Sequence, residues 1–115
     1  MATYVLVFGK LHRLEDKAAF EAAFEEVSRA VVSSTPGILR DELILDSVDP
    51  CAYIMLSIWE SKEAWASWQR APIHEEQVGS MQQYWQGQGV KIFNTVFVVA
   101  NDAPATSAIA ATAIA

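Results

Sequence analysis

The spacing of hydrophobic residues divides the first hundred positions into strands and helices. Residues 3–11 are rich in Val, Leu, Phe and Tyr, which predicts a strand. Residues 14–34 predict an amphipathic helix, with Asp16 able to cap its start and Pro36-Gly37 ending it. The apolar stripe of this helix recurs at intervals of four, three and four residues: Phe20, Phe24, Val27 and Val31.

Two further strands follow, joined by a short polar turn. Residues 38–46 and 52–59 have strand composition, and the turn between them contains Asp46, Asp49 and Pro50. Two strands with so short a connection predict an antiparallel hairpin.

The remaining pattern predicts two helices and a last strand. Ser61 is a good N-cap for a helix from Lys62 to about Ala71, where Pro72 interrupts. A second helix is expected from Ile73 to about Trp85, ended by the glycines at 87 and 89. Residues 91–100, dense in Val and Phe, predict the final strand.

This order of elements predicts an α+β fold of the ferredoxin-like type, βαββαβ, with a four-stranded antiparallel sheet and helices on one face. The fold is expected to occupy residues 1–100. Residues 101–115 are a low-complexity C-terminal tail of Ala, Thr, Ser and Ile. Their expected state is a frayed end, with docking of Ile109 and Ile114 on a partner as the alternative.

Strands that are apolar on both faces point to a second copy of the chain. In residues 52–59, Ile54, Leu56 and Ile58 occupy one face, while Tyr53, Met55 and Trp59 occupy the other. The last strand is expected to repeat this, with Phe93, Phe97 and Val99 opposite Ile92, Val96 and Val98. Helices can cover only one face, so we expect a symmetric homodimer in which two sheets pack together.

Composition excludes several classes of function. The 115 residues are 52% hydrophobic and carry a net charge of −6. The eight basic residues are scattered, which argues against nucleic-acid binding. No apolar run approaches the roughly 20 residues of a membrane helix, and the N-terminus lacks a secretory signal, so a cytoplasmic protein with no membrane partner is expected.

The candidate chemistry lies in an aromatic cluster and one histidine. The spacing of His, Cys and acidic residues matches no metal site. Trp65 and Trp68 are neighbours on one predicted helix surface, close to Trp59 at a strand end. On the next predicted helix an apolar stripe with Gln77 beside it includes an imidazole: His74, Val78, Met81 and Trp85. Such residues either pack as core or form the walls of a site for a flat ligand.

Three stretches resemble the antibiotic-biosynthesis-monooxygenase family. They are residues 36–40 (PGILR), 49–53 (DPCAY) and 59–68 (WESKEAWASW), within a likeness that extends over about residues 3–100. The resemblance implies a dimeric α/β barrel. In one branch, anthrone monooxygenases oxidise flat phenols with O₂ and without metal or flavin, and Trp59 and Trp65 match aromatic site positions there. The site Asn of that branch corresponds to Met55.

A second branch of the family binds and degrades haem. Trp68 matches its pocket Trp, and its axial His falls near Gln77, one turn after His74. The preferred interpretation is a cofactor-independent monooxygenase acting with O₂ on an aromatic or quinone-like small molecule. The alternatives are a haem-binding or haem-degrading protein and a non-catalytic dimeric ligand-binding module.

In the preferred interpretation no cofactor or metal is needed, and haem is the alternative cofactor. His74 is the expected general base, because its ordinary pKa near 6.5 suits proton transfer around neutrality. The catalytic candidates are His74, Trp59 and Trp65. The substrate-binding candidates are Trp68, Met55, Tyr53, Gln77, Met81 and Trp85.

Overall fold

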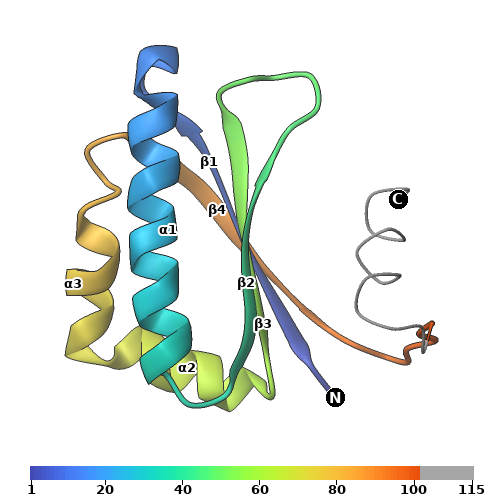
Figure 1. Cartoon of the computed structure of the whole chain (residues 1–115). Helices are drawn as coiled ribbons and strands as arrows, with labels where there is room; N and C mark the ends of the chain where they lie inside the picture. The colour runs from blue at the N-terminus through green and yellow to red at the C-terminus, as the bar shows by residue number, and fades with distance from the viewer. Residues whose placement is uncertain (102–115) are drawn as a thin grey trace.

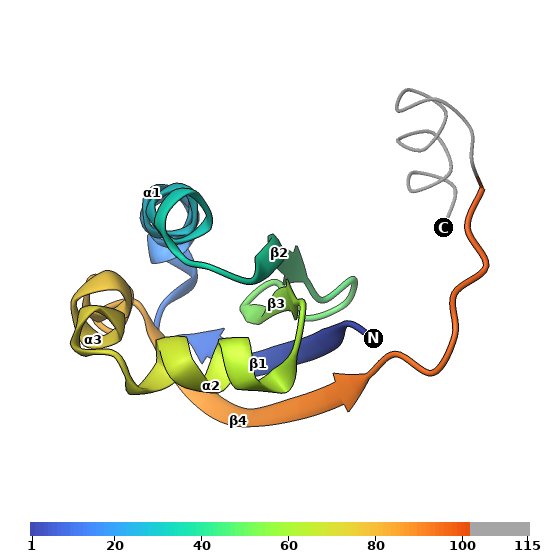
Figure 2. The same cartoon turned by 90° about the horizontal axis from the view of Figure 1, so that it is seen from below.

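A computed structural model describes residues 1–101 of the chain, and the predicted tail at 102–115 lies outside the described residues. Four antiparallel strands form one sheet in the order β2-β3-β1-β4. The strands are β1 (Thr3–Leu11), β2 (Ile38–Leu45), β3 (Ala52–Trp59) and β4 (Trp85–Asn94). The helices α1 (Lys17–Ser34), α2 (Lys62–Arg70) and α3 (Pro72–Gly79) all lie on one side of the sheet (Figures 1 and 2). The predicted ferredoxin-like α+β fold is confirmed.

The first helix begins differently from the prediction. A short 3₁₀ helix at Leu14–Asp16 precedes α1, and the Asp16 side chain makes no capping hydrogen bond. Its carboxylate instead accepts hydrogen bonds from the Arg13 guanidinium at 3.2 and 3.3 Å. The charged partner three residues earlier therefore takes the oxygens that a cap would use. The apolar stripe is as predicted, with Phe20, Phe24 and Val31 buried.

The hairpin and the start of α2 agree closely with the prediction from the sequence. Ser61 caps α2 as predicted, since its hydroxyl accepts the Ala64 N–H at 3.1 Å. Gly37 allows the tight entry into β2, because its φ of +87° is a left-handed conformation and a Cβ there would lie 2.6 Å from the Cβ of Ala64. This turn brings the start of β2 against α2.

The predicted helix from Ile73 to Trp85 is wrong in its second half. Helix α3 ends at Gly79, and Trp85 already begins β4, where it pairs with Leu11. The glycine-containing segment after Trp85 belongs to the strand, with a register shift opposite Phe8 and Gly9. Sheet pairing with β1 therefore overrides the helical spacing that the apolar residues suggested.

The last strand also ends earlier than predicted. It stops at Asn94, so Val96 to Val99 lie beyond the sheet and are exposed: Val96 by 85% and Phe97 by 77%. The predicted two-faced pattern of the last strand therefore applies to Ile92 and Phe93 and does not extend to residues 96–99. No helix within residues 1–101 is long and apolar enough to cross a membrane.

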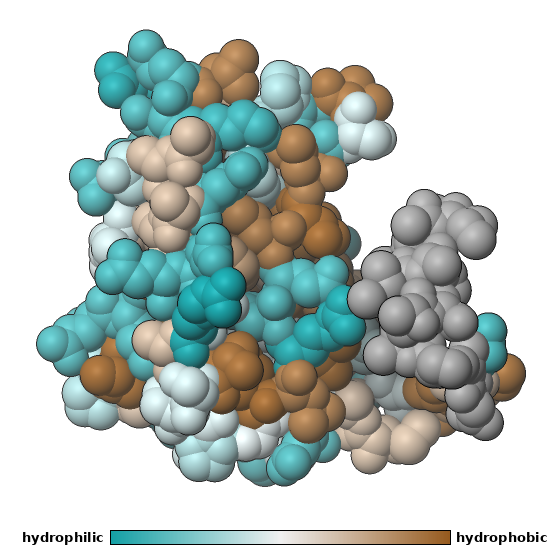
Figure 3. All heavy atoms as spheres, in the orientation of Figure 1, coloured by the Kyte–Doolittle hydropathy of each residue, from teal (hydrophilic) through white to brown (hydrophobic). Residues whose placement is uncertain are grey.

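The side of the sheet away from the helices is apolar along the central strands β1 and β3, and the flanking strands add charged residues at its edges: Arg40, Glu42 and Lys91. We call this surface the open face; its pairs include Leu6 with Leu56, Phe8 with Ile54 and Tyr4 with Ile58. These side chains are only partly buried, and Phe93 at the same face is 52% exposed. In the space-filling view, hydrophobic residues gather towards the sheet, whereas hydrophilic residues dominate around α1 (Figure 3). The expected apolar second face is therefore present.

Candidate functional site

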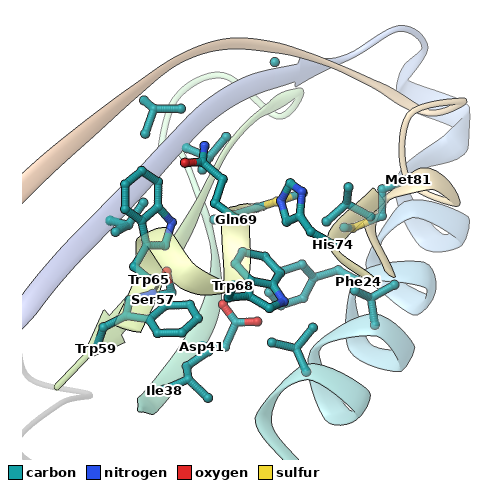
Figure 4. A pocket seen from close by; sticks show the side chains of 18 of the residues that line it. Phe24, Ile38, Asp41, Ser57, Trp59, Trp65, Trp68, Gln69, His74 and Met81 are labelled. Carbon is teal, nitrogen blue, oxygen red and sulfur yellow. Dashed lines mark hydrogen bonds between the residues drawn. The ribbon is translucent and has the colours of Figure 1, made fainter. Parts of the chain in front are cut away.

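A cavity of about 320 Å³ lies between the sheet and the three helices; we call it the main cavity (Figure 4). All four strands and all three helices contribute to its wall. Most of the lining is aliphatic or aromatic, and the polar side chains are Asp41, Ser57, Gln69, His74 and Gln82. Ligand sites in proteins commonly combine apolar walls with a few convergent polar groups.

Three tryptophans from β3 and α2 meet at this cavity. Trp59 ends β3 and is fully buried, with its indole N–H donating to the Ser57 hydroxyl at 2.8 Å. The ring of Trp68 packs against it with centroids 5.5 Å apart. Trp65 lies three residues before Trp68, so both reach the cavity from one surface of α2. The Ser61 cap fixes the start of α2 two residues after Trp59, which brings the three rings together.

The helix break between α2 and α3 places His74. Ala71 is extended (φ −71°, ψ 140°), and Pro72 starts α3, so the chain turns sharply between the two helices. The imidazole of His74 then stands edge-on to the Trp68 ring, with centroids 4.3 Å apart and ring planes at 89°. Burial lowers the pKa of His74 below its ordinary value, against the opposing effect of Glu75. The ring is therefore neutral at pH 7 and can accept a proton.

A carboxyl group on β2 faces the same cavity. Asp41 pairs with Ser57 across the hairpin and lines the cavity together with the tryptophans. Burial raises its pKa from 3.8 to about 6, a hydrogen bond with Ser28 opposes this shift, and the nearby charge of Glu42 adds to it. No Lys or Arg is among the described residues that line the cavity. Asp41 is thus a carboxylate without a cationic partner in the cavity wall.

Seven of the nine predicted site residues line the main cavity. They are the three tryptophans 59, 65 and 68, with Met55, His74, Met81 and Trp85. Met81 and Trp85 reach it from the turn after α3 and the start of β4, although they were assigned to one helix with His74. Both are buried, and Gly9 leaves room for the Trp85 ring, since a Cβ there would lie 2.4 Å from it.

Tyr53 and Gln77 lie elsewhere. The Tyr53 ring packs edge-on against Phe20 in the core, and its hydroxyl bonds to Glu21 at 2.5 Å and Lys17 at 2.7 Å. Gln77 acts behind the wall, where its Oε1 accepts the indole N–H of Trp68 at 2.9 Å. Gln77 therefore holds a wall residue in place and does not itself line the cavity.

Sequence reasoning missed Asp41, Ser57, Gln69 and Gln82. Only Asp41 had a usable signal: in β2 it has the same parity as Leu43, which places an acidic side chain on the helix-facing side of the sheet. A single charge among apolar inward positions is a candidate functional group. The other three are common surface residue types, and only the folded chain shows where they point.

Solved structures with the same fold support this arrangement of elements. The cofactor-independent oxygenase SnoaB from Streptomyces nogalater superposes with a TM-score of 0.72 at 15% identity, covering 87% of this chain and 98% of SnoaB. A putative antibiotic biosynthesis monooxygenase from Caulobacter crescentus CB15 gives 0.73 at 18% identity, covering 84% and 91%. A dimeric protein of unknown function from Bacteroides fragilis gives 0.68 at 14% identity, covering 82% and 96%. At these identities the likeness establishes the fold alone.

Sequence comparison adds the family. Among curated proteins, no sequence matches this chain significantly. The family model described as antibiotic biosynthesis monooxygenase matches residues 5–78, which include most of β1, all of α1, the hairpin, all of α2 and nearly all of α3. On this match over more than half of its length, the chain belongs to the antibiotic biosynthesis monooxygenase family.

Proposed function

We propose that this protein is a cofactor-independent oxygenase that acts with O₂ on an aromatic or quinone-like small molecule. The observation that carries the proposal is the main cavity, in which three tryptophans surround a space of about 320 Å³ beside a neutral imidazole. Aromatic walls bind flat rings, and a neutral imidazole accepts protons. Family membership and the SnoaB fold support the same class of reaction.

The proposed reaction needs a base and a dry site. His74 removes a proton from an acidic C–H or O–H of the bound ring, and the resulting anion transfers an electron pair to O₂. With an anthrone, the methylene carbon becomes a carbonyl by gaining one oxygen atom. The second oxygen atom leaves as water with the two methylene hydrogens. The apolar wall excludes competing water, and Trp68, next to His74, fixes the imidazole plane.

We further propose that the working unit is a homodimer with two open faces packed together, a dimeric α/β barrel. The apolar side chains of this surface on β1 and β3 are only partly covered in one copy. A contiguous apolar surface of this kind marks an interface in most proteins. The Bacteroides fragilis structure with this fold is a dimer by its description, which supports the proposal.

The residues present fit haem less well. A cavity of about 320 Å³ is at the lower end of the range for ligand sites, roughly 300–1,000 Å³, and suits a few fused rings better than a macrocycle. No Lys or Arg among its described lining residues would meet the propionates. Gln77, at the position of the family's axial His, already bonds Trp68.

The test is oxygen consumption with dithranol, a commercial anthrone, in metal-chelated buffer. We expect protein-dependent uptake of one O₂ per anthrone converted to its quinone, lost in His74→Ala and kept in His12→Ala, which changes the other, exposed histidine. Oxidation that is unaffected by His74→Ala contradicts the base role. A saturable Soret shift on haem titration, with no dithranol turnover, would move the protein to the haem alternative. Tight binding of dithranol without turnover would support a ligand-binding module.

A further inference from the structure

The main cavity holds a carboxylate that the proposed reaction does not use. Asp41 lies on β2, opposite Ser57 and across the cavity wall from α2 and α3. Figure 4 places it among the labelled tryptophans together with His74. Its polar neighbours in the wall are uncharged amides, a hydroxyl and a neutral imidazole: Gln69, Gln82, Ser57 and His74. A largely buried carboxylate with no cation beside it in the cavity wall can accept a further hydrogen bond from a ligand.

We propose that Asp41 is the ligand-binding acceptor of this site, and that its carboxylate makes the cavity select a neutral phenol, or another ring bearing an O–H or N–H donor, over the corresponding anion. The inference rests on the proposed function for the aromatic nature of the ligand and adds which form of the ring is bound. A phenolic O–H supplies a further donor beside the Ser28 hydroxyl. A phenolate taken up from solution would add a second net negative charge to an apolar space, which is strongly unfavourable at low effective dielectric. The anion formed in the proposed reaction adds no net charge, because its proton stays in the cavity on His74.

Asp41 also has access to solvent on its other side. It lines a shallow surface groove between α1 and β2 together with Phe24, Ser28 and Arg29. The Ser28 hydroxyl donates to the carboxylate from α1, so one hydrogen bond is supplied from the groove side. Asp41 can therefore exchange its proton with solvent while a ligand fills the main cavity.

The charged groups around Asp41 do not replace the ligand's donor. From α1, Glu25 and Arg29 face the groove, but they bind each other at 2.7 Å. From β2, Glu42 points to the open face and pairs with Arg40. From α3, His74 is neutral at pH 7, and β3 offers only the Ser57 hydroxyl at this position. The pKa of Asp41, about 6, keeps it largely ionised at neutral pH.

The probe for this inference is 4-nitrophenol, whose neutral and anionic forms differ in absorption and which lacks the methylene carbon that becomes a carbonyl in the proposed anthrone reaction. We expect wild-type protein to bind it in its neutral form, so that the affinity falls about tenfold per pH unit above the probe's own pKa. Asp41→Asn keeps an oxygen acceptor without the charge. It should match wild type at low pH and bind the probe at least tenfold more tightly at high pH.

The matched control is Glu26→Gln, which removes an exposed carboxylate of α1 that does not line the main cavity and does not contribute to the Asp41 pKa, so it should follow wild type. Asp41→Asn binding within twofold of wild type at high pH would overturn the inference, as would no saturable binding of the neutral probe to wild type. Because the probe reports binding and not turnover, the result is separate from the dithranol assay. If dithranol is oxygenated but the pH dependence of 4-nitrophenol binding is the same in Asp41→Asn and wild type, only this inference is rejected. If 4-nitrophenol binds as expected but dithranol is not oxygenated, only the proposed function is rejected.

Discussion

The imidazole of His74 stands at right angles to the indole of Trp68, with ring centroids 4.3 Å apart. The Trp68 N–H in turn donates to Gln77, one turn further along α3 than His74. His74 and Gln77 of α3 thus both contact Trp68 of α2, one through its ring and the other through a hydrogen bond. This contact fixes the angle between the two helices and the direction of the proposed base.

The pH dependence of turnover tests the base. Because burial lowers the His74 pKa below 6.5, the neutral imidazole is the favoured form at neutral pH. As pH increases through the weakly acidic range, we expect the rate of dithranol turnover to rise to a plateau. His74→Ala should lower this plateau rate by about 100-fold or more. His12→Ala should keep the wild-type profile. A wild-type rate that falls across the same range as pH rises would contradict a neutral base.

Asp41 makes the stability of the fold depend on pH. Its pKa in the folded state, about 6, lies above its ordinary value of 3.8, so the folded state holds the proton more tightly than the unfolded state. The contribution of Asp41 to the free energy of unfolding is therefore greatest below pH 3.8 and is lost as pH rises through 6. We expect this residue to remove on the order of 2–3 kcal/mol from the free energy of unfolding between these limits. Urea denaturation of wild type and Asp41→Asn at several pH values measures it.

In that experiment the free energy of unfolding of Asp41→Asn should increase relative to that of wild type as pH rises, because an amide carries no charge to desolvate. Glu26→Gln again serves as control, since its exposed side chain does not contribute to the Asp41 pKa. A difference between Asp41→Asn and wild type that is constant with pH would mean that Asp41 titrates normally in the folded state.

The open face should hold the dimer together. Leu56 lies on β3, a central strand, and pairs with Leu6 on β1. Leu56→Glu would bring a charge into the packed sheets, so we expect it to shift wild-type dimers to monomers in sedimentation at micromolar concentration. Val48→Glu, in the 88% exposed turn position, should leave the mass unchanged. A monomeric wild-type protein would contradict the two-sheet arrangement.

Gly9 should be intolerant of any side chain. A Cβ at this position would lie 2.4 Å from the Trp85 ring and 2.6 Å from the Gln86 carbonyl oxygen. We expect Gly9→Ala to lower the free energy of unfolding by about 1–3 kcal/mol, because the ring and strand must both move. Thermal or urea denaturation measures this loss.

The matched control is Gly79→Ala. Its Cβ would meet nothing within 4 Å, and it should leave stability unchanged or raise it by up to about 1 kcal/mol through helix propensity. Equal stability of Gly9→Ala and wild type would show that Trp85 is not fixed against β1 as described.

The sequence by itself determined the elements with strong local signals. The first strand, the hairpin strand 52–59 and the Ser61 cap are where the pattern predicted them, because alternation, β-branched composition and a capping hydroxyl act over a few residues. The aromatic part of the site was also predictable, since Trp59, Trp65 and Trp68 lie within ten positions around a well-marked junction.

Only the tertiary structure decided the end of α3, the start of β4 and the polar part of the site. Met81 and Trp85 have helical spacing from His74, but pairing of β4 with β1 turns Trp85 into a strand residue. Tyr53 was expected in the site and lies in the core, because Lys17 and Glu21 on α1 hold its hydroxyl. Alternation along β2 could place Asp41 on the helix-facing side, but only the tertiary structure showed its burial. Burial raises the pKa of this carboxyl group and depends on the packing of elements distant in sequence.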